Sequence, residues 1–424
     1  MTAVIGILNK QGVALAADSA VTVMGGNQKK IYNTANKIFT LSKFHPVSIM
    51  IYSSSSFMQT PWEIIIKLYR KKLSDNKFDT VSEYKDDFIN FLRENNYFTT
   101  EEGQLHNLKQ FIYWNLNNLK DGVLRKLSAG KPEEELRIEF VDLFHKELQI
   151  IIDSYSDRKR ILREFEEYPF DEFKLYIGEG IKEISKIIFE DIDIKDDFIE
   201  LMIKQYHCLL TSNNFIGVET GLVFAGYGDK EIYPSLVSVN IAQAFDNKLR
   251  YYEFRNVQIS DKLNGSIQPF AQTDVIDMFL TGIDPNMDNV YFSIFKDSLN
   301  KYHSFIADSI KDLNEEISEK IKTLNIDEVS QEFYQEMNKV KRELQINPTV
   351  ETVSILSKED LSEMAESLIY LTYLKRRISS DEESVGGPID VAIISKGDGL
   401  IWKKRKHYFT QELNKHFMAN YFNK

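Results

Sequence analysis

The 424-residue chain has one cysteine, Cys208, only nine prolines and no long hydrophobic run. A single cysteine excludes a disulfide framework and is typical of proteins from a reducing compartment. The apolar stretches fall short of the roughly 20 residues that a membrane-spanning helix needs, and the amino terminus lacks the basic and apolar regions of a signal peptide. These absences predict a soluble, cytoplasmic protein with no membrane partner.

The chain also has few histidines and no excess of positive charge. Its seven histidines show no metal-ligand spacing such as His-Glu-x-x-His, and "YIGEGIKE" lacks the spacing of a phosphate-binding loop. The net charge of −12 argues against a nucleic-acid-binding surface, and we interpret the one basic cluster, 403–407, as the solvated edge of a strand. We therefore expect no metal, no cofactor and no nucleic-acid partner.

What the sequence does contain is a succession of strand-like and helix-like blocks. Four short apolar runs in the first sixty residues predict strands joined by tight turns in an antiparallel meander. Helical periodicity fills about 62–212 and again about 274–344, and strands lie between and after these blocks. Because single strands do not alternate with helices, this order favours an α+β fold of antiparallel sheets covered by helices.

Thr2 is the first candidate functional residue. A threonine hydroxyl is a weak nucleophile at neutral pH and needs a base within hydrogen-bonding reach. If Met1 is removed, the free α-amine of Thr2, with an ordinary pKa of about 8, can take the hydroxyl proton directly or through water. Threonine is also common as a second residue, so its position alone does not distinguish a nucleophile from an ordinary residue.

The stretch "TAVIGILNKQGVALAADSAVT", residues 2–22, resembles the opening of the proteasome β-subunit-like family of N-terminal nucleophile (threonine) hydrolases, including its bacterial proteasome-like branch. That family has a leading threonine, a Gly-Val turn and an Ala-x-Asp-Ser element. The resemblance implies that Thr2 is the nucleophile, that Asp18 holds a catalytic lysine, and that Thr22 pairs with substrate. Where the family has an arginine this chain has Ala20, which alters the charge around the site.

The resemblance also implies a lysine and an oxyanion-stabilising amide. The family lysine opens a strand of the form Lys-Val/Ile-x-x-Leu/Ile, and "KIFTL" gives Lys37. Lys30 is the alternative, because the loop before Lys37 is longer than usual. The positive charge lowers proton affinity near the hydroxyl. The family's glycine-rich turn reads "YSSSSF" here, with Ser53 at the glycine position, where a backbone N–H would stabilise the oxyanion.

Further matching motifs lie toward the carboxyl end. "GLVFAGYGDKEIYPSLVSVN" is similar to the family's strand, Ala-Gly-Tyr and Pro-x-Leu sequence, and "DEESVGG" to its Asp-x-x-Ser-Gly-Gly motif. The likeness implies Asp381 and Ser384 as anchors of the threonine amine. Glu382 or Glu383 is an alternative acid, because a valine separates the serine from the glycines. Thr273 is the hydroxyl nearest to the remaining family serine.

The same resemblance implies an overall architecture. It predicts a four-layer αββα sandwich, the N-terminal nucleophile hydrolase fold, with extensive helical insertions. We assign 1–57, 213–290 and 349–424 to the sandwich core. We assign 58–212 to one helical insertion and 291–348 to a second.

The sequence thus predicts a threonine-type peptidase or amidohydrolase that cleaves peptide or protein substrates after removal of Met1. Two other interpretations stay open: a catalytically inactive assembly or interaction module, and a hydrolase of small amides. Relatives in the family form rings, so the resemblance also implies a homo-oligomer, whose contacts the insertions could block or create.

Overall fold

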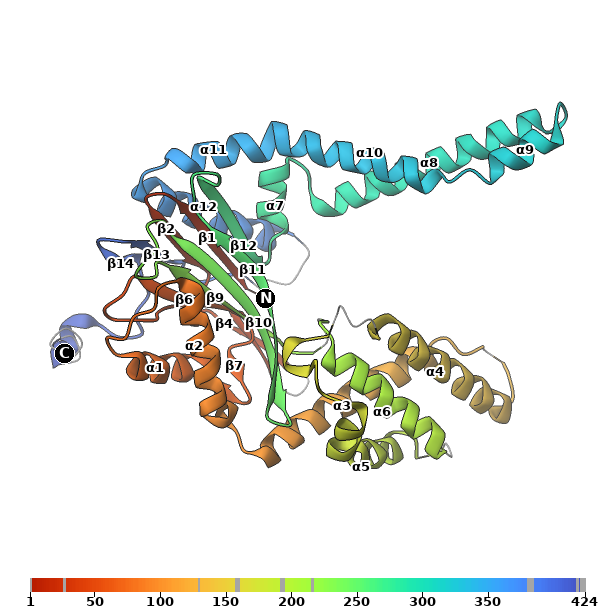
Figure 1. Ribbon diagram of the computed structural model, residues 1–424, viewed down its shortest axis with the longest axis horizontal. Helices are drawn as coiled ribbons and strands as arrows, with labels where there is room; N and C mark the ends of the chain where they lie inside the picture. The colour runs from red at the N-terminus through yellow and green to blue at the C-terminus, as the bar shows by residue number, and fades with distance from the viewer. Residues whose placement is uncertain are drawn as a thin grey trace.

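The fold combines antiparallel sheets with helices, which confirms the predicted α+β class (Figure 1). The computed structural model describes residues 2–25, 28–128, 130–156, 161–190, 195–214, 217–379, 385–416 and 419. No helix in this part of the chain is long and apolar enough to cross a membrane.

The first sheet contains the amino-terminal strands and has the order β12-β1-β2-β13-β14, with each neighbouring pair antiparallel. Its strands are β1 (Ala3–Asn9), β2 (Gly12–Ala17), β12 (Gly265–Ala271), β13 (Asp390–Ser395) and β14 (Gly399–Lys404). Every residue of β1 and β2 is buried. Burial on both faces explains why these strands read as continuous apolar runs without alternation.

The second sheet has the order β11-β10-β9-β6-β5, also antiparallel. Its strands are β5 (Ile38–Thr40), β6 (Val47–Ser53), β9 (Thr220–Gly226), β10 (Ser235–Phe245) and β11 (Lys248–Gln258). Two small hairpins stand apart from both sheets, β3 (Val21–Gly25) with β4 (Gln28–Tyr32) and β7 (Ser56–Phe57) with β8 (Thr60–Pro61).

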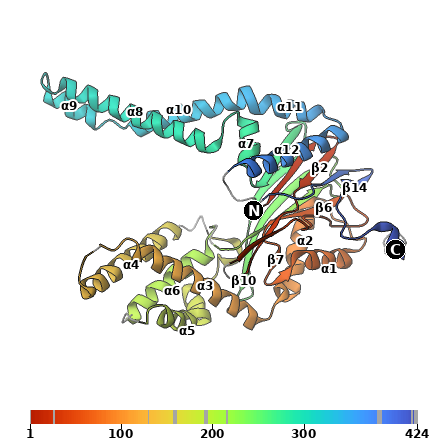
Figure 2. The ribbon, with the colours of Figure 1, turned by 180° about the vertical axis from the view of Figure 1, so that it is seen from behind.

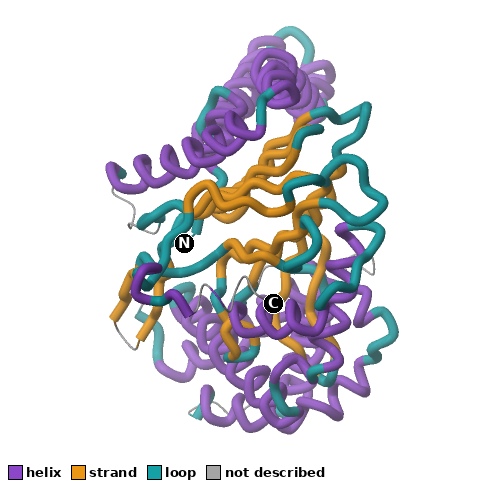
Figure 3. The backbone as a smooth tube through the Cα atoms, turned by 90° about the vertical axis from the view of Figure 1, so that its left-hand side faces the viewer, coloured by secondary structure: helices purple, strands orange, loops and turns teal. Residues whose placement is uncertain are grey.

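The predicted single meander of the first strands is wrong. β1 and β2 belong to the first sheet, whereas β5 and β6 belong to the second. The chain passes from one sheet to the other after the β3–β4 hairpin, because the apolar faces of the two sheets bury each other. Their shared cluster draws Val4 and Leu15 from the first sheet and Met50 and Val223 from the second, and the two layers of strands are visible in Figure 3.

Helices cover the outer faces of both sheets. On the first sheet, α11 (Asn347–Ile355) and α12 (Lys358–Ile378) pack against β1, as Figure 2 shows for α12. On the second, α1 (Trp62–Leu73) and α2 (Val81–Glu94) share a buried cluster with the strands. The buried residues of α2 recur every three or four positions, so one helical face supplies them.

The remaining helices form two extensions that leave the sheets on the same side (Figures 1 and 2). One has its own apolar cluster and comprises α3 (Glu101–Leu124), α4 (Glu133–Tyr155), α5 (Phe170–Ile188) and α6 (Asp196–Thr211). The other is an arm of α8 (Pro285–Lys311), α9 (Glu315–Lys322) and α10 (Ile326–Lys341), joined to the sheets through α7 (Asp274–Thr281) and the π-helical turn Arg342–Ile346. The division of the chain into core and insertions stays a prediction.

Gly226, the last residue of β9, is a position where the fold requires glycine. Its φ is +139°, and a Cβ there would lie 1.9 Å from the carbonyl oxygen of Pro46. We expect Gly226→Ala to lower the free energy of unfolding by at least about 2 kcal/mol, from backbone strain and steric overlap. Urea denaturation measures this loss.

Gly122 provides the matched control. It lies inside α3, where a Cβ would meet nothing within 4 Å, so Gly122→Ala should raise the free energy of unfolding by about 0.5–1 kcal/mol. Equal effects of the two substitutions would contradict the role given to Gly226.

Candidate active site

A buried ion pair lies next to the start of β1. Lys37 Nζ is 2.5 Å from Asp18 Oδ1, and the two side chains are 5% and 1% exposed. Asp18 directly follows β2 and Lys37 directly precedes β5, so the pair joins the two sheets. Lys30, the alternative lysine, is an exposed residue of β4. The structure therefore brings Lys37 to Asp18.

The Asp18 carboxylate is held in place by backbone amides as well as by Lys37. Oδ1 accepts a hydrogen bond from the Ala3 N–H at 2.9 Å, and Oδ2 accepts from the N–H groups of Ala20 at 3.0 Å and Gly386 at 3.1 Å. Hydrogen bonds to an ionised carboxylate are stronger than neutral ones. The Ala3 N–H and the Lys37 ammonium group both donate to Asp18 Oδ1. The ammonium group is therefore anchored beside the peptide bond that links Ala3 to Thr2.

Burial lowers the pKa of Lys37 below its usual 10.5, because desolvation disfavours the charged ammonium, while the Asp18 carboxylate raises it. A second ion pair, Lys406 with Asp390, contributes opposite and weaker effects on that pKa. Asp390 lies opposite Ala17 in the β13–β2 register, one residue from Asp18. The site therefore contains two neighbouring ion pairs in low-dielectric surroundings.

Lys406 and Asp390 were not among the residues predicted from the sequence. Their side chains are 12% and 3% exposed, and the backbone N–H of Lys406 donates to Asp390 Oδ1 at 2.8 Å. The interpretation of 403–407 as a solvated strand edge is therefore wrong for Lys406. The basic cluster itself was the only local signal, and it carried no information about a carboxylate 16 residues earlier.

Thr2 lies at the end of the first sheet and is 5% exposed. Its carbonyl oxygen accepts a hydrogen bond from the Gln272 N–H at 3.1 Å, and Ala3 is paired with Ala271 in the β1–β12 register. Thr273, which directly precedes α7, is the next residue after Gln272 and so follows the end of the strand that pairs with β1. The fold thus gathers Thr2, Asp18 and Lys37 at one place, with Thr273 after the end of the neighbouring strand.

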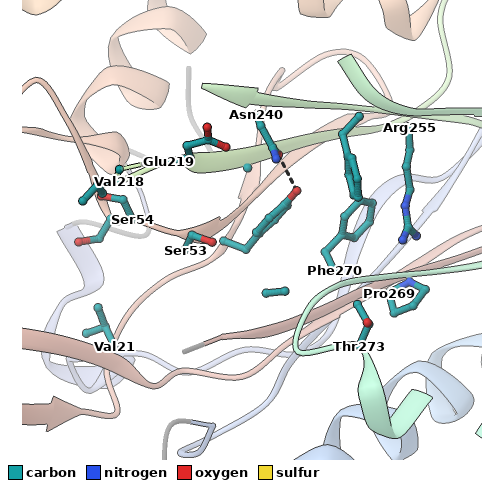
Figure 4. A pocket seen from close by; sticks show the side chains of 16 residues that line it. Val21, Ser53, Ser54, Val218, Glu219, Asn240, Arg255, Pro269, Phe270 and Thr273 are labelled. Atoms are coloured by element: carbon teal, nitrogen blue, oxygen red, sulfur yellow. Dashed lines mark hydrogen bonds between the residues drawn. The ribbon is translucent and has the colours of Figure 1, made fainter. Parts of the chain in front are cut away.

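A cavity of about 680 Å³ lies beside this end of the sheet (Figure 4). Its lining comes from the ends of β6, β9 and β12, from the middle of β10 and β11, and from Val21 at the start of β3. Ser53 and Thr273, both predicted site residues, are part of the lining, and Thr2 is not. The cavity reaches Ala271, which pairs with Ala3, whereas Asp18 and Lys37 are not part of its lining.

Two lining residues have strained backbones. Ser53 has φ +69° and Ala271 has φ +65°, a left-handed conformation that costs residues with a Cβ about 1–2 kcal/mol. Such outliers concentrate at functional sites. The sequence motifs matched Ser53 to a glycine position, and its backbone conformation is one that glycine adopts freely.

The polar wall of the cavity is a chain of hydrogen bonds. Tyr52 Oη donates to Asn240 Oδ1 at 2.8 Å, Asn240 Nδ2 donates to Tyr252 Oη at 2.8 Å, and Tyr252 Oη donates to Glu219 Oε2 at 3.2 Å. The Tyr52 ring lies so close to Gly221 that a Cβ there would be 1.8 Å from Tyr52 Cζ. Glycine at this position therefore makes space for the ring that forms the wall.

Burial raises the pKa of Glu219, while the Arg250 charge and the Tyr252 hydroxyl lower it. Between the ordinary glutamate pKa of about 4.3 and the raised pKa of Glu219, the folded protein therefore holds a proton that the unfolded chain releases. Stability then falls as pH rises through this window. Glu219→Gln cannot ionise, so its melting temperature should rise relative to the wild type as pH increases from about 4 to about 8.

Differential scanning fluorimetry across this pH range measures the effect, with Glu179→Gln on the exposed surface of α5 as the control for loss of a carboxylate. Parallel curves of melting temperature against pH for Glu219→Gln and the wild type would refute the assignment.

The structure describes less of the other predicted site residues. Thr22 belongs to β3, where its backbone pairs with Ile31, and its side chain is not described. Asp381 and Ser384 lie outside the described residues, as do the alternatives Glu382 and Glu383. Among the residues that the structure does describe, no group of three or more His, Cys, Asp and Glu side chains could hold a metal ion.

No protein-family profile matches the chain, and no curated protein matches it. Among the solved structures with a distant likeness to the chain are three of Anbu proteins. The Anbu (Gly-1) mutant from Hyphomicrobium sp. strain MC1 has 10% identity and a TM-score of 0.30, over 100% of this chain and 96% of that chain. Anbu (ancestral beta-subunit) from Yersinia bercovieri has 10% identity and a TM-score of 0.30, over 99% of this chain and 94% of that chain. The helical assembly of the Anbu complex from Pseudomonas aeruginosa has 9% identity and a TM-score of 0.28, over 99% of this chain and 94% of that chain.

These comparisons correct the family assignment that the sequence motifs predicted. The solved structures described above are Anbu proteins, and identities near 10% with TM-scores of 0.26–0.30 are too low to support an assignment. The prediction that the chain is a member of the proteasome β-subunit-like family of N-terminal nucleophile hydrolases is therefore wrong as a statement of membership. The short motifs match, but the chain as a whole does not.

Proposed function

We propose that this protein is an N-terminal threonine hydrolase that cleaves peptide bonds after Met1 has been removed. The observation that supports the proposal is the shared position of Lys37 Nζ and the Ala3 N–H on Asp18 Oδ1, immediately next to Thr2. A buried lysine held by an aspartate places a positive charge where a threonine amine and hydroxyl would react.

In the proposed reaction, Thr2 Oγ attacks the substrate carbonyl carbon while the Thr2 α-amine takes the hydroxyl proton. The same amine then gives that proton to the leaving amine of the substrate, and the acyl group stays on Thr2 as an ester. Water, deprotonated by the α-amine, hydrolyses the ester and regenerates the hydroxyl. The Lys37 ammonium lowers the proton affinity of the nearby groups, so that the amine is neutral and the hydroxyl is more acidic at physiological pH.

The other predicted residues complete this proposal. The strained turn at Ser53 presents a backbone N–H to the oxyanion of the tetrahedral intermediate, and Thr22 pairs with the substrate backbone. Asp381 and Ser384 anchor the Thr2 amine, and Thr273 contributes the remaining hydroxyl of the catalytic site. The substrate side chains occupy the cavity.

We also infer that the layers of the fold form a four-layer αββα sandwich. α1 and α2 cover one sheet, α11 and α12 cover the other, and a common apolar cluster lies between the sheets. In this arrangement the strand ends that carry Thr2, Asp18 and Ser53 lie at one edge of the sandwich. In this proposal the active-site residues come from the strands and the loops at their ends, and none comes from the helical extensions.

A second candidate, an inactive interaction module, is favoured by two observations. Thr2 is 5% exposed and does not line the cavity. The arm carries apolar side chains in solvent, among them Tyr302 at 62% and Phe305 at 67% exposure. Such exposed apolar side chains are typical of a surface that contacts another protein.

A substrate panel separates these functions. The purified protein is incubated with a mixture of blocked peptides and, separately, with small amides, and the products are read by mass spectrometry. The proposal predicts new peptide termini that are absent with the Thr2→Ala protein. Cleavage of small amides alone would replace peptides with a small-amide substrate. No product from either set would support the interaction module.

A further inference from the structure

Arg255 in β11 is the one described arginine in the lining of the cavity, and its guanidinium lies close to two aromatic rings. The guanidinium carbon is 5.0 Å from the ring centroid of Phe254 and 5.1 Å from that of Phe270, and both phenylalanines also line the cavity. Rings at these distances attract the cation and restrict its orientation. Arg255 is therefore held against the cavity wall in a limited range of positions (Figure 4).

The hydrogen-bonding capacity of Arg255 is mostly unused by the described residues. Nη1 donates to Gln268 Oε1 at 2.9 Å, whereas a guanidinium has five N–H donors. Asp277 acts on Arg255 only through its charge, and no ion pair between Arg255 and a carboxylate forms in the described part of the chain. Arg250 in the same strand differs, because Leu210 and Asn214 accept its hydrogen bonds.

The opposite wall of the cavity does not neutralise Arg255. Glu219 is its only acidic lining residue among those described. Its Oε2 accepts a hydrogen bond from Tyr252 Oη at 3.2 Å, and no lysine or arginine in the described part of the chain forms an ion pair with it. The remaining polar groups, Tyr52 and Asn240, are neutral and hydrogen-bonded to each other. The cavity therefore offers one fixed positive charge to whatever occupies it.

We propose that Arg255 binds a carboxylate of the substrate, so that the cavity selects acidic peptides. A carboxylate accepts two parallel N–H bonds from a guanidinium, and most N–H donors of Arg255 are unused by the described residues. The place of this carboxylate next to the reacting bond rests on the proposed function, because Phe270 and Ala271 lie on the strand that pairs with β1. Two sources can supply the group, an acidic side chain or a free peptide carboxyl terminus.

Binding is measured on the Thr2→Ala protein, so that turnover does not enter the result. Isothermal titration calorimetry compares three acetylated peptides of otherwise identical sequence. The first has a glutamate and an amidated end, the second a glutamine and an amidated end, and the third a glutamine and a free carboxyl end. Tighter binding of the first identifies an acidic side chain, and tighter binding of the third identifies the terminal carboxylate. We expect a preference of about 10-fold or more over the second peptide.

Substitutions at Arg255 then assign the preference. Arg255→Met should abolish it, whereas Arg255→Lys should keep part of it, because the charge remains and the two-pronged geometry is lost. Arg137→Met, which removes an exposed cation from α4 that pairs with Glu133, should leave the preference unchanged, and melting temperatures verify that each variant is folded. Equal affinities for all three peptides, or a preference that survives Arg255→Met, would overturn the inference. Arg255-dependent binding without turnover by the wild type would instead overturn only the proposed hydrolase.

Discussion

Thr2→Ala should reduce kcat/KM for a blocked peptide substrate by about 10³-fold or more, because it removes the proposed nucleophile. Alanine is smaller than threonine and fits the buried position at the end of β1, where the Thr2 backbone carbonyl accepts from Gln272. The Ala3 bond to Asp18 is a backbone interaction and remains. The loss should therefore appear in turnover, with little change in melting temperature.

Two further variants make this result specific to Thr2. Thr2→Ser keeps a hydroxyl and an α-amine, so its activity should lie within about 10-fold of the wild type. Thr273→Ala removes a neighbouring hydroxyl that lines the cavity, and it should cost less than Thr2→Ala. Full activity in the Thr2→Ala protein would contradict the mechanism, because no other residue has been assigned the nucleophilic step.

Lys37→Met should lower the free energy of unfolding by about 3–5 kcal/mol, because it leaves the Asp18 carboxylate buried without its cation. The three backbone donors to Asp18 offset part of that cost. The same substitution should reduce turnover by about 10²-fold or more, since the charge that tunes the Thr2 amine is lost. Chemical denaturation and steady-state kinetics measure the two effects separately.

The double variant Lys37→Met/Asp18→Asn tests the origin of the instability. It removes the buried charge as well as its partner, so it should recover part of the lost free energy without restoring turnover. Lys67→Met, which breaks an exposed pair with Glu63, is the surface control and should change stability by less than about 1 kcal/mol. A Lys37→Met protein as stable as the Lys67→Met protein would show that the Asp18–Lys37 pair contributes little.

Much of the fold class followed from local sequence patterns. The order of strand-like and helix-like blocks predicted an α+β protein with antiparallel sheets, because side-chain periodicity reports which face of each element is buried. The distribution of the strands between two sheets did not follow, since it depends on contacts between residues far apart in the chain. β1 pairs with β12, for example, across some 260 positions of sequence.

Only part of the candidate site was predicted, because some of its residues lie in local motifs and others come together only in the folded chain. The motif around Asp18 and the strand after Lys37 are local, and the structure brings the two residues together. Arg255 and Glu219 follow no motif, because their common property is the cavity they face, which forms only when β9, β11 and β12 come together. Short motifs likewise suggested a family that the comparisons across the whole chain did not support. The homo-oligomer and the cytoplasmic location stay predictions.

The central claim is that Thr2 becomes the amino terminus and acts as the nucleophile. Intact-mass analysis of the purified protein, before and after treatment with an electrophile that requires both a threonine Oγ and a free α-amine, tests it most directly. The account predicts a mass without Met1 and one adduct per chain, which the Thr2→Ala protein does not form. Retention of Met1 in active protein, or an adduct that persists in Thr2→Ala, would contradict it.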